Sequence, residues 1–110
     1  MSEAAADEEL ADGVMAALRR VIDPELGYNI VDLGLVYRVE IDKGTVHVVM
    51  TTTTRGCPAT DYLRDGATDA VDSALGVESV TVELTYDPPW TPEMMSQKAK
   101  EHLGIGDGGW

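Results

Sequence analysis

The chain has 110 residues, of which 44% are hydrophobic, and carries a net charge of −12 from 20 acidic and 8 basic side chains. This length fits one domain with one core, and the charge repels phosphate backbones and anionic lipid headgroups, which argues against nucleic acid and membrane as partners. The charge either serves solubility alone or attracts a basic protein or a metal cation. One cysteine cannot form an internal disulfide, and the N-terminus does not resemble a signal peptide, so we expect a cytoplasmic protein.

The first part of the chain predicts a helix and an ordered loop. We assign residues 1–6 to a disordered N-terminus and residues 7–105 to a single domain. From about Asp7 to Ile22, apolar residues recur at spacings of three and four, which is typical of a helix, and Asp23-Pro24 ends it because a residue before proline avoids the α region. Residues 23–34 combine turn formers with four apolar anchors, which predicts a loop packed against the domain.

The middle of the chain predicts a β-hairpin and a second helix. Residues 37–41 alternate between apolar and polar side chains, and residues 46–50 do so again after an Asp-Lys-Gly turn. We expect the second strand to continue through Thr51–Thr54, because threonine is β-branched and suits a strand. From Pro58 to about Leu75 the apolar spacing is helical, with proline at the favoured first position.

The last part of the chain completes the predicted fold. Residues 80–86 alternate as a third strand, which must run parallel to the second because a helix connects the two. A further helix is expected from Thr91 to Leu103, and residues 106–110 form a flexible tail. The order helix, hairpin, helix, strand, helix predicts an α+β fold, with a small mixed three-stranded sheet and helices packed mainly on one face.

Cys57 is the main candidate for a functional atom. It precedes Pro58, at the point where the predicted strand has ended and the helix begins. Backbone N–H groups and the helix dipole favour negative charge there, and such positions favour the thiolate, which is both nucleophile and metal ligand. Arg55 would act in the same direction. The alternative is a buried, inert cysteine that packs as a small hydrophobe.

Three carboxylates and two threonines form a second group of candidates. Asp23, Glu25 and Asp32 lie in the predicted loop, and Thr53 and Thr54 lie shortly before the cysteine. Carboxylate, hydroxyl and thiolate share one pocket only if the loop folds over the end of the second strand. Spacing alone does not decide this, because aspartates in such loops commonly act as turn formers.

The usual patterns of catalytic and metal sites are incomplete. His47 and His102 are the candidate bases for a cysteine nucleophile, but neither lies near Cys57 in the sequence. This argues against the hypothesis that the protein is a Cys–His hydrolase. One cysteine cannot hold a cluster that needs four thiolates, although two chains meeting at this residue would offer two. The glycine motifs of phosphate-binding loops are absent. Trp90 either caps the end of the sheet, which we favour, or contacts a partner.

Four stretches of the chain resemble the metal–sulfur cluster biosynthetic family. They are Asp-Pro-Glu-Leu at 23–26, Ile-Val-Asp-Leu-Gly-Leu-Val-Tyr at 30–37, Thr-Thr-Thr-Thr-Arg-Gly-Cys-Pro at 51–58 and Asp-Pro-Pro-Trp-Thr-Pro-Glu-Met-Met-Ser at 87–96. The resemblance covers roughly residues 10–105. The Pro-Pro-Trp-Thr-Pro ending is similar to the SufT branch, and the chain lacks the cysteine-bearing extension of PaaD-type relatives. Arg55 stands where relatives often have proline.

The resemblance implies an accessory factor in iron–sulfur cluster assembly or delivery, and not an enzyme. It implies a pocket formed by Asp23, Glu25, Thr53, Thr54 and Cys57, in which the cysteine makes transient contact with iron, a cluster or a partner. No cofactor would be permanently bound, and the partners would be the iron–sulfur assembly machinery and client apoproteins, or a second copy of the chain. The residues also leave open a thiol-dependent enzyme acting on a small substrate, or a pure protein adaptor.

Overall fold

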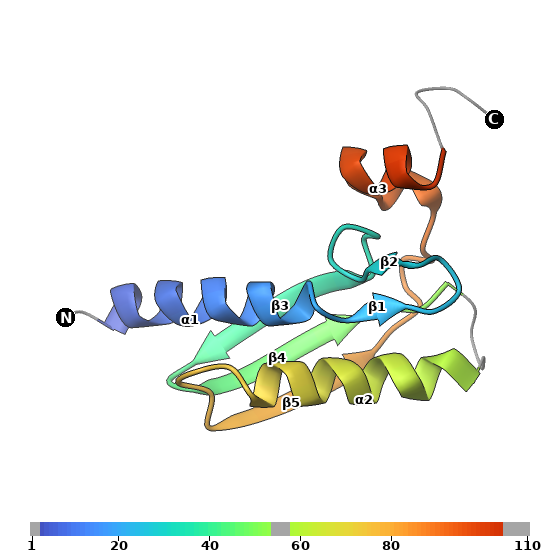
Figure 1. The fold of residues 1–110 in the computed structure, drawn as a ribbon. Coiled ribbons are helices and arrows are strands. Elements are labelled where there is room, and N and C mark those ends of the chain that lie inside the picture. Colours follow the sequence, from blue (N-terminus) through green and yellow to red (C-terminus); the bar gives the residue numbers. More distant parts are fainter. Residues whose placement is uncertain (1–2, 54–57, 105–110) are drawn as a thin grey trace.

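The computed structural model describes residues 3–53 and 58–104, which form an α+β fold, as predicted. Its helices and strands follow in the order α1 (Glu3–Leu18), β1 (Ile22–Asp23), β2 (Tyr28–Asn29), β3 (Val36–Asp42), β4 (Thr45–Met50), α2 (Pro58–Asp72), β5 (Ser79–Leu84), the 3-10 helix η1 (Pro92–Met94) and α3 (Gln97–His102) (Figure 1). No helix in these two ranges is long and apolar enough to cross a membrane.

The main sheet has three strands in the order β3-β4-β5. β3 and β4 are antiparallel, with Val39 opposite Val48, and β4 and β5 are parallel, with Val48 opposite Val82. A shift in the β3–β4 register falls between Val36 and Arg38. This mixed topology is the predicted one. Helices α1 and α2 lie side by side on one face of the sheet (Figure 1).

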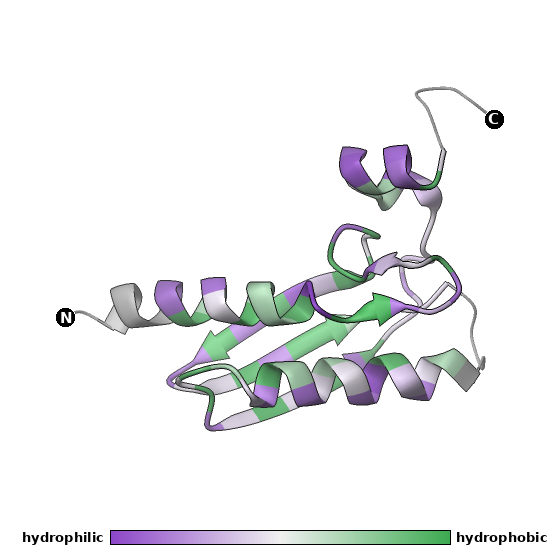
Figure 2. Ribbon diagram, in the orientation of Figure 1, coloured by the Kyte–Doolittle hydropathy of each residue, from purple (hydrophilic) through white to green (hydrophobic). Residues whose placement is uncertain are grey.

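The hydrophobic core lies between the two long helices and the sheet. Figure 2 shows hydrophobic residues along β4 and in stripes on α1 and α2. The fully buried residues of these elements include Val14, Leu18, Val46, Val48, Met50, Leu63, Ala67 and Val71. Burying one large aliphatic side chain contributes roughly 1.5–3 kcal/mol, so this layer supplies most of the driving force for folding. Two residues of the predicted loop, Ile30 and Leu33, are also buried in this core, as is Leu35 directly after the loop.

The first helix and the loop after it differ from the prediction. Helix α1 begins at Glu3 and ends at Leu18, four residues before the predicted end, because Ile22 and Asp23 pair with Asn29 and Tyr28. These residues form a short antiparallel hairpin, β1–β2, inside the stretch expected to be a loop. Ile22 lies at the end of the stretch with helical spacing, but it belongs to the hairpin, where it pairs with Asn29.

The C-terminal helix is also shorter than predicted. The backbone is extended at Met95, which separates η1 from α3, and Ser96 caps α3 by accepting a hydrogen bond from the Ala99 N–H (3.2 Å). The Ser96 N–H donates to the Asp32 carbonyl at 2.7 Å, so contact with a distant loop fixes this break. Gly34 permits the close approach, because an added Cβ would lie 2.4 Å from the Met94 carbonyl oxygen.

Candidate functional site

Asp23 organises the turn between β1 and β2. Its side chain is buried, and its Oδ1 atom accepts hydrogen bonds from the backbone N–H groups of Glu25 (2.7 Å) and Leu26 (3.0 Å). Its own carbonyl accepts from the Gly27 N–H at 2.7 Å. A buried carboxylate is costly unless it is hydrogen-bonded, and the turn supplies these bonds. Asp23 therefore holds the shape of the loop, and Glu25 lies on its exposed side.

Asp32 connects the loop to the C-terminal segment. Its carboxylate accepts a hydrogen bond from the Asn29 side-chain N–H at 2.7 Å, and its backbone N–H donates to the Asn29 side-chain Oδ1 at 2.9 Å. The bond from Asn29 lowers the pKa of Asp32 below its usual value near 3.8, against a smaller opposing effect of burial; Ser96, Arg19 and Lys98 also lower it. Asp32 thus joins Asn29 of β2 to Ser96 at the start of α3.

The threonine run begins where strand β4 ends. We had expected the strand to continue through Thr51–Thr54, but it stops at Met50, and Thr51–Thr53 are not part of it. The Thr51 N–H donates to the Leu35 carbonyl at 2.8 Å, beyond the last residue pair of the ladder. Thr51 and Thr52 are buried, and Thr53 is half-buried. The first two threonines are therefore part of the core, and Thr53 lies at its margin.

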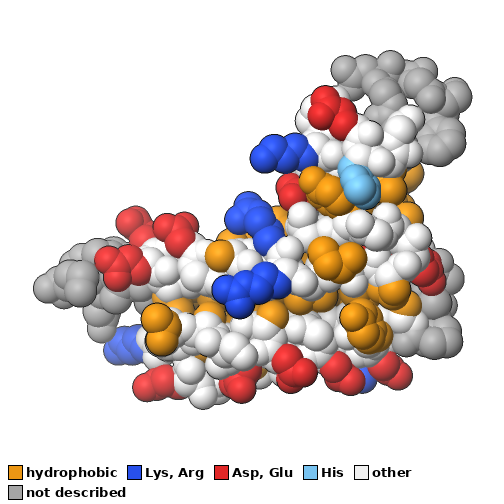
Figure 3. Space-filling model, viewed as in Figure 1, with side chains coloured by type: hydrophobic (Ala, Val, Ile, Leu, Met, Phe, Trp, Pro, Cys, Tyr) orange, Lys and Arg blue, Asp and Glu red, His pale blue; other side chains and the backbone are white. Residues whose placement is uncertain are grey.

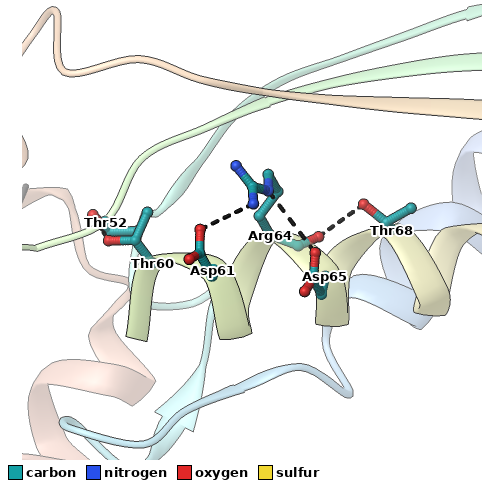
Figure 4. Close-up of polar contacts among 6 residues, drawn as sticks. All are labelled: Thr52, Thr60, Asp61, Arg64, Asp65 and Thr68. Atoms are coloured by element: carbon teal, nitrogen blue, oxygen red, sulfur yellow. Dashed lines mark hydrogen bonds and ion pairs between the residues drawn. The ribbon is translucent and has the colours of Figure 1, made fainter. Parts of the chain in front are cut away.

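Three hydroxyl groups, from Thr52, Thr60 and Tyr86, meet beside the start of α2. The Thr52 Oγ1 atom lies 3.0 Å from the Tyr86 Oη and 3.4 Å from the Thr60 Oγ1. Figure 4 shows Thr52 next to Thr60 in the first turn of the helix. Hydroxyls both donate and accept hydrogen bonds, so this hydroxyl cluster can adapt to a neutral or an anionic neighbour.

The hydroxyl cluster was not predicted as a unit from the sequence. Its members come from three segments: the pairing of β4 with β5 brings Thr52 to Tyr86, and the start of α2 adds Thr60. One signal was available: in the parallel register Met50 lies opposite Leu84, and two further steps along both strands place Thr52 opposite Tyr86.

Two members of the predicted pocket, Thr54 and Cys57, lie outside the described residues. The pocket of Asp23, Glu25, Thr53, Thr54 and Cys57 therefore remains a prediction. The turn that carries Asp23, the segment 51–53 and the start of α2 all lie toward the same end of the sheet (Figure 1). Strand β1 also packs against α2, which brings the Asp23 turn to the helix that begins directly after the cysteine.

The two histidines lie elsewhere. His47 alternates with the buried Val46 and Val48, so it faces the side of the sheet opposite the helices. Its Nε2 atom is 3.2 Å from the Glu83 Oε1, without the geometry of a hydrogen bond. The ring of His102 lies against Tyr28, with ring centroids 4.7 Å apart. Within residues 3–53 and 58–104, no three His, Cys, Asp or Glu side chains are grouped as metal ligands.

Trp90 is half-buried against the core. Its indole N–H donates to the Leu33 carbonyl at 2.7 Å, which agrees with the packing role that we favoured. Nearby, the Tyr37 hydroxyl donates to the Pro88 carbonyl at 2.8 Å, and burial raises the pKa of Tyr37. A contact between Trp90 and a partner protein stays a prediction.

Comparison with known proteins now adds to this geometry. A family model described as "iron-sulfur cluster assembly protein" matches residues 11–84, which span α1 through β5 apart from the first turns of α1. The chain belongs to this family. The matched region includes Asp23, the threonine run and Cys57, and it ends before Tyr86 and Trp90.

Several relatives are similar over nearly their whole length. The chain is 43% identical over 100 residues to the Fe–S protein maturation auxiliary factor YitW of Bacillus subtilis, which covers 90% of this chain and 98% of that protein. It is 43% identical to the Fe–S protein maturation auxiliary factor SufT of Staphylococcus aureus, over 77% of this chain and 98% of the relative. The SufT-like resemblance is therefore confirmed.

A crystal structure supports the fold. A domain of unknown function from Bacillus anthracis superposes with a TM-score of 0.83 at 38% identity, covering 90% of this chain and 95% of the other. The arrangement of helices and sheet is thus shared by this family member.

Proposed function

We propose that this protein is an accessory factor in iron–sulfur cluster assembly or in the delivery of clusters to client proteins. The observation that carries the proposal is its similarity to YitW, which is named a maturation auxiliary factor and is matched over 98% of its length. The partners are the cluster assembly machinery and client apoproteins.

The inventory of ligands favours transient handling of a cluster. The chain has one cysteine, whereas an iron–sulfur cluster held by thiolates usually needs four. The cluster or iron is then cargo, and the other ligands come from a partner or from a second copy of the chain. In this proposal the Cys57 thiolate is the contact that this chain provides.

The position of Cys57 in the sequence supports a thiolate. It directly precedes α2, a helix of 15 residues, and the N-terminus of a helix favours negative charge through its free N–H groups and its dipole. Asp23 and Glu25 would shape the pocket from the β1–β2 turn, and the side chains of Thr53 and Thr54 would hydrogen-bond to the thiolate or its ligand. The hydroxyl cluster beside the first turn of α2 would support them.

The proposal is tested in a host from which the gene has been deleted. We expect wild type to restore the activity of an aconitase-type enzyme under iron limitation, and Cys57→Ser to fail although the variant accumulates to the same level. Asp12→Asn is the control, because Asp12 is exposed on α1 and is not a member of the predicted pocket, and it should restore activity. If Cys57→Ser restores activity fully while the deletion strain is defective, the thiolate has no role.

A second test addresses the cargo directly. After anaerobic incubation with iron and sulfide, wild type should retain iron, sulfide and visible absorption, all of which Cys57→Ser should lose. Cluster-bound protein of twice the mass would identify a second copy as the source of the other ligands. Equal retention by wild type and variant would contradict contact through the thiolate. An iodoacetamide titration with a midpoint near the ordinary thiol value of about 8.5 would contradict a resting thiolate.

A further inference from the structure

A shallow groove runs between strand β1 and helix α2. Its volume is about 420 Å³, and Val21 and Ile22 line one side while Tyr62 and Gly66 line the other. Gly66 lies beside Val21, and a Cβ added there would make an ordinary contact, 3.4 Å from the Val21 Cγ1. We call this feature the β1–α2 groove.

The groove exposes large apolar side chains. Ile22 is 45% exposed and Tyr62 is 61% exposed, and these are two of the four large hydrophobic residues found exposed in the described ranges. Exposed apolar residues are common singly, but neighbouring ones that line one groove mark an interaction surface. Tyrosine is also among the side chains that contribute most to protein interfaces.

An acidic row borders the groove along α2. Asp61, Asp65, Asp69 and Asp72 follow one another at spacings of four, four and three residues, which places them along one side of the helix. Figure 3 shows acidic side chains in a row over α2, below hydrophobic side chains. Asp65 and Asp69 line the groove itself.

Charges within the groove are arranged asymmetrically. Arg64 is 2.9 Å from Asp61 and 3.9 Å from Asp65 (Figure 4), so it neutralises only the first part of the row. Arg20 lines the groove together with Val21 and Ile22, on the side across from α2. A bound segment would therefore be oriented with its positive side chains toward α2.

We propose that the β1–α2 groove binds a basic amphipathic segment of a partner protein. Apolar side chains of that segment pack against Ile22 and Tyr62, and lysine or arginine side chains face Asp65 and Asp69. Charge complementarity selects this occupant, because an acidic segment would be repelled by the row. The inference concerns protein docking and depends on neither Cys57 nor the presence of iron.

The test uses a defined probe and no metal. A fluorescently labelled synthetic helix of leucine and lysine is titrated with the wild-type protein at about 0.15 M salt. A second peptide with glutamate in place of lysine has the same apolar pattern and should not bind. Amide chemical-shift changes should concentrate at Ile22, Tyr62 and Gly66.

Variants separate the groove from the general acidity of the protein. We expect Tyr62→Ala to weaken binding about tenfold and Tyr62→Phe to retain it. Asp65→Asn/Asp69→Asn should weaken binding about fivefold. The matched control is Glu93→Gln/Glu101→Gln, which removes the same charge from exposed positions on η1 and α3 and should have little effect.

Three outcomes would overturn the inference. They are the absence of binding to the basic peptide, an equal loss of affinity in the control variant, and shift changes spread over the whole acidic surface. A failure here leaves the cluster-handling tests unaffected, since those follow iron, sulfide and client activity.

Discussion

At the scale of single residues, the buried carboxylate of Asp23 accepts two backbone hydrogen bonds and is therefore tightly constrained. Asp23→Ala removes the acceptor of two backbone N–H groups, and unpaired polar groups of this kind cost about 1–3 kcal/mol. Asp23→Asn keeps an acceptor oxygen and should lose less. Urea unfolding measures both. If Asp23→Ala unfolds at the same urea concentration as wild type, the turn does not depend on this side chain.

The lowered pKa of Asp32 predicts that the stability of the protein depends on pH. The pKa of Asp32 in the folded protein lies below the usual value near 3.8, so the unfolded chain binds more protons in this range. The contribution of Asp32 is therefore fully present above the ordinary pKa and is lost as the pH falls through the lowered one. Below about pH 4, wild type should lose stability more steeply than Asp32→Asn, as measured by urea unfolding at a series of pH values.

A matched variant makes the Asp32 prediction specific. Asp12 is an exposed carboxylate on α1, and Asp12→Asn changes the net charge by the same amount. It should leave the acid dependence of stability close to that of wild type. If the Asp12 and Asp32 variants flatten the pH profile equally, general charge accounts for the effect and the Asn29 hydrogen bond does not.

At the scale of elements, periodicity predicted those parts that bury one face locally. The alternation of residues 37–41 and 46–50 corresponds to β3 and β4. The parallel direction of β5 followed from the helix that connects β4 to β5. The errors lie where a contact with another segment decides. Ile22 leaves the helical pattern to pair with Asn29, and Ser96 begins a new helix where its N–H reaches Asp32.

The candidate site shows the same division between local and distant contacts. That Asp23 acts in a turn could be predicted from its place before proline, and the structure gives the bonds that hold it. The hydroxyl cluster joins residues 34 positions apart, so it follows only from the strand register. Thr52 was predicted to be a strand residue because threonine is β-branched, and local spacing gave no sign of its hydroxyl partners.

Replacing either of two glycines inside helices with alanine should stabilise the protein. Gly66 of α2 and Gly13 of α1 each destabilise a helix by about 0.8–1 kcal/mol relative to alanine. A Cβ at Gly13 meets nothing within 4 Å, and at Gly66 it makes one ordinary contact, with Val21. Each alanine variant should therefore raise the melting temperature by about 4 °C, measured by circular dichroism.

Gly34 provides the contrast for this prediction. Its φ of 78° lies in the left-handed region, and its Cβ would overlap the Met94 carbonyl. Gly34→Ala should lower the melting temperature, while the two helical variants raise it. A decrease for Gly66→Ala alone would mean that α2 and β1 are packed too tightly to accept a methyl group.

At the scale of the whole molecule, the two faces of the sheet have different environments. The helices cover one face, and the other carries charged side chains such as Arg38 and Glu40, whose Nε and Oε1 atoms are 2.7 Å apart. This pair is exposed, and exposed ion pairs contribute little to stability. The fold therefore depends on its single core, while the net charge of −12 opposes compaction.

This balance predicts that salt stabilises the protein. The screening length falls from about 30 Å at 0.01 M to about 8 Å at 0.15 M salt, which relieves repulsion among the acidic side chains. The free energy of unfolding in urea should rise over this range of sodium chloride.

Variants at Asp72 test the same repulsion. Asp72→Lys makes the net charge less negative by two and replaces an acid at the C-terminal end of α2, where the helix dipole disfavours it. It should raise stability at low salt and flatten the salt dependence, and Asp72→Asn should do half as much. A fall in wild-type stability with salt would instead mean that the few surface ion pairs outweigh the repulsion.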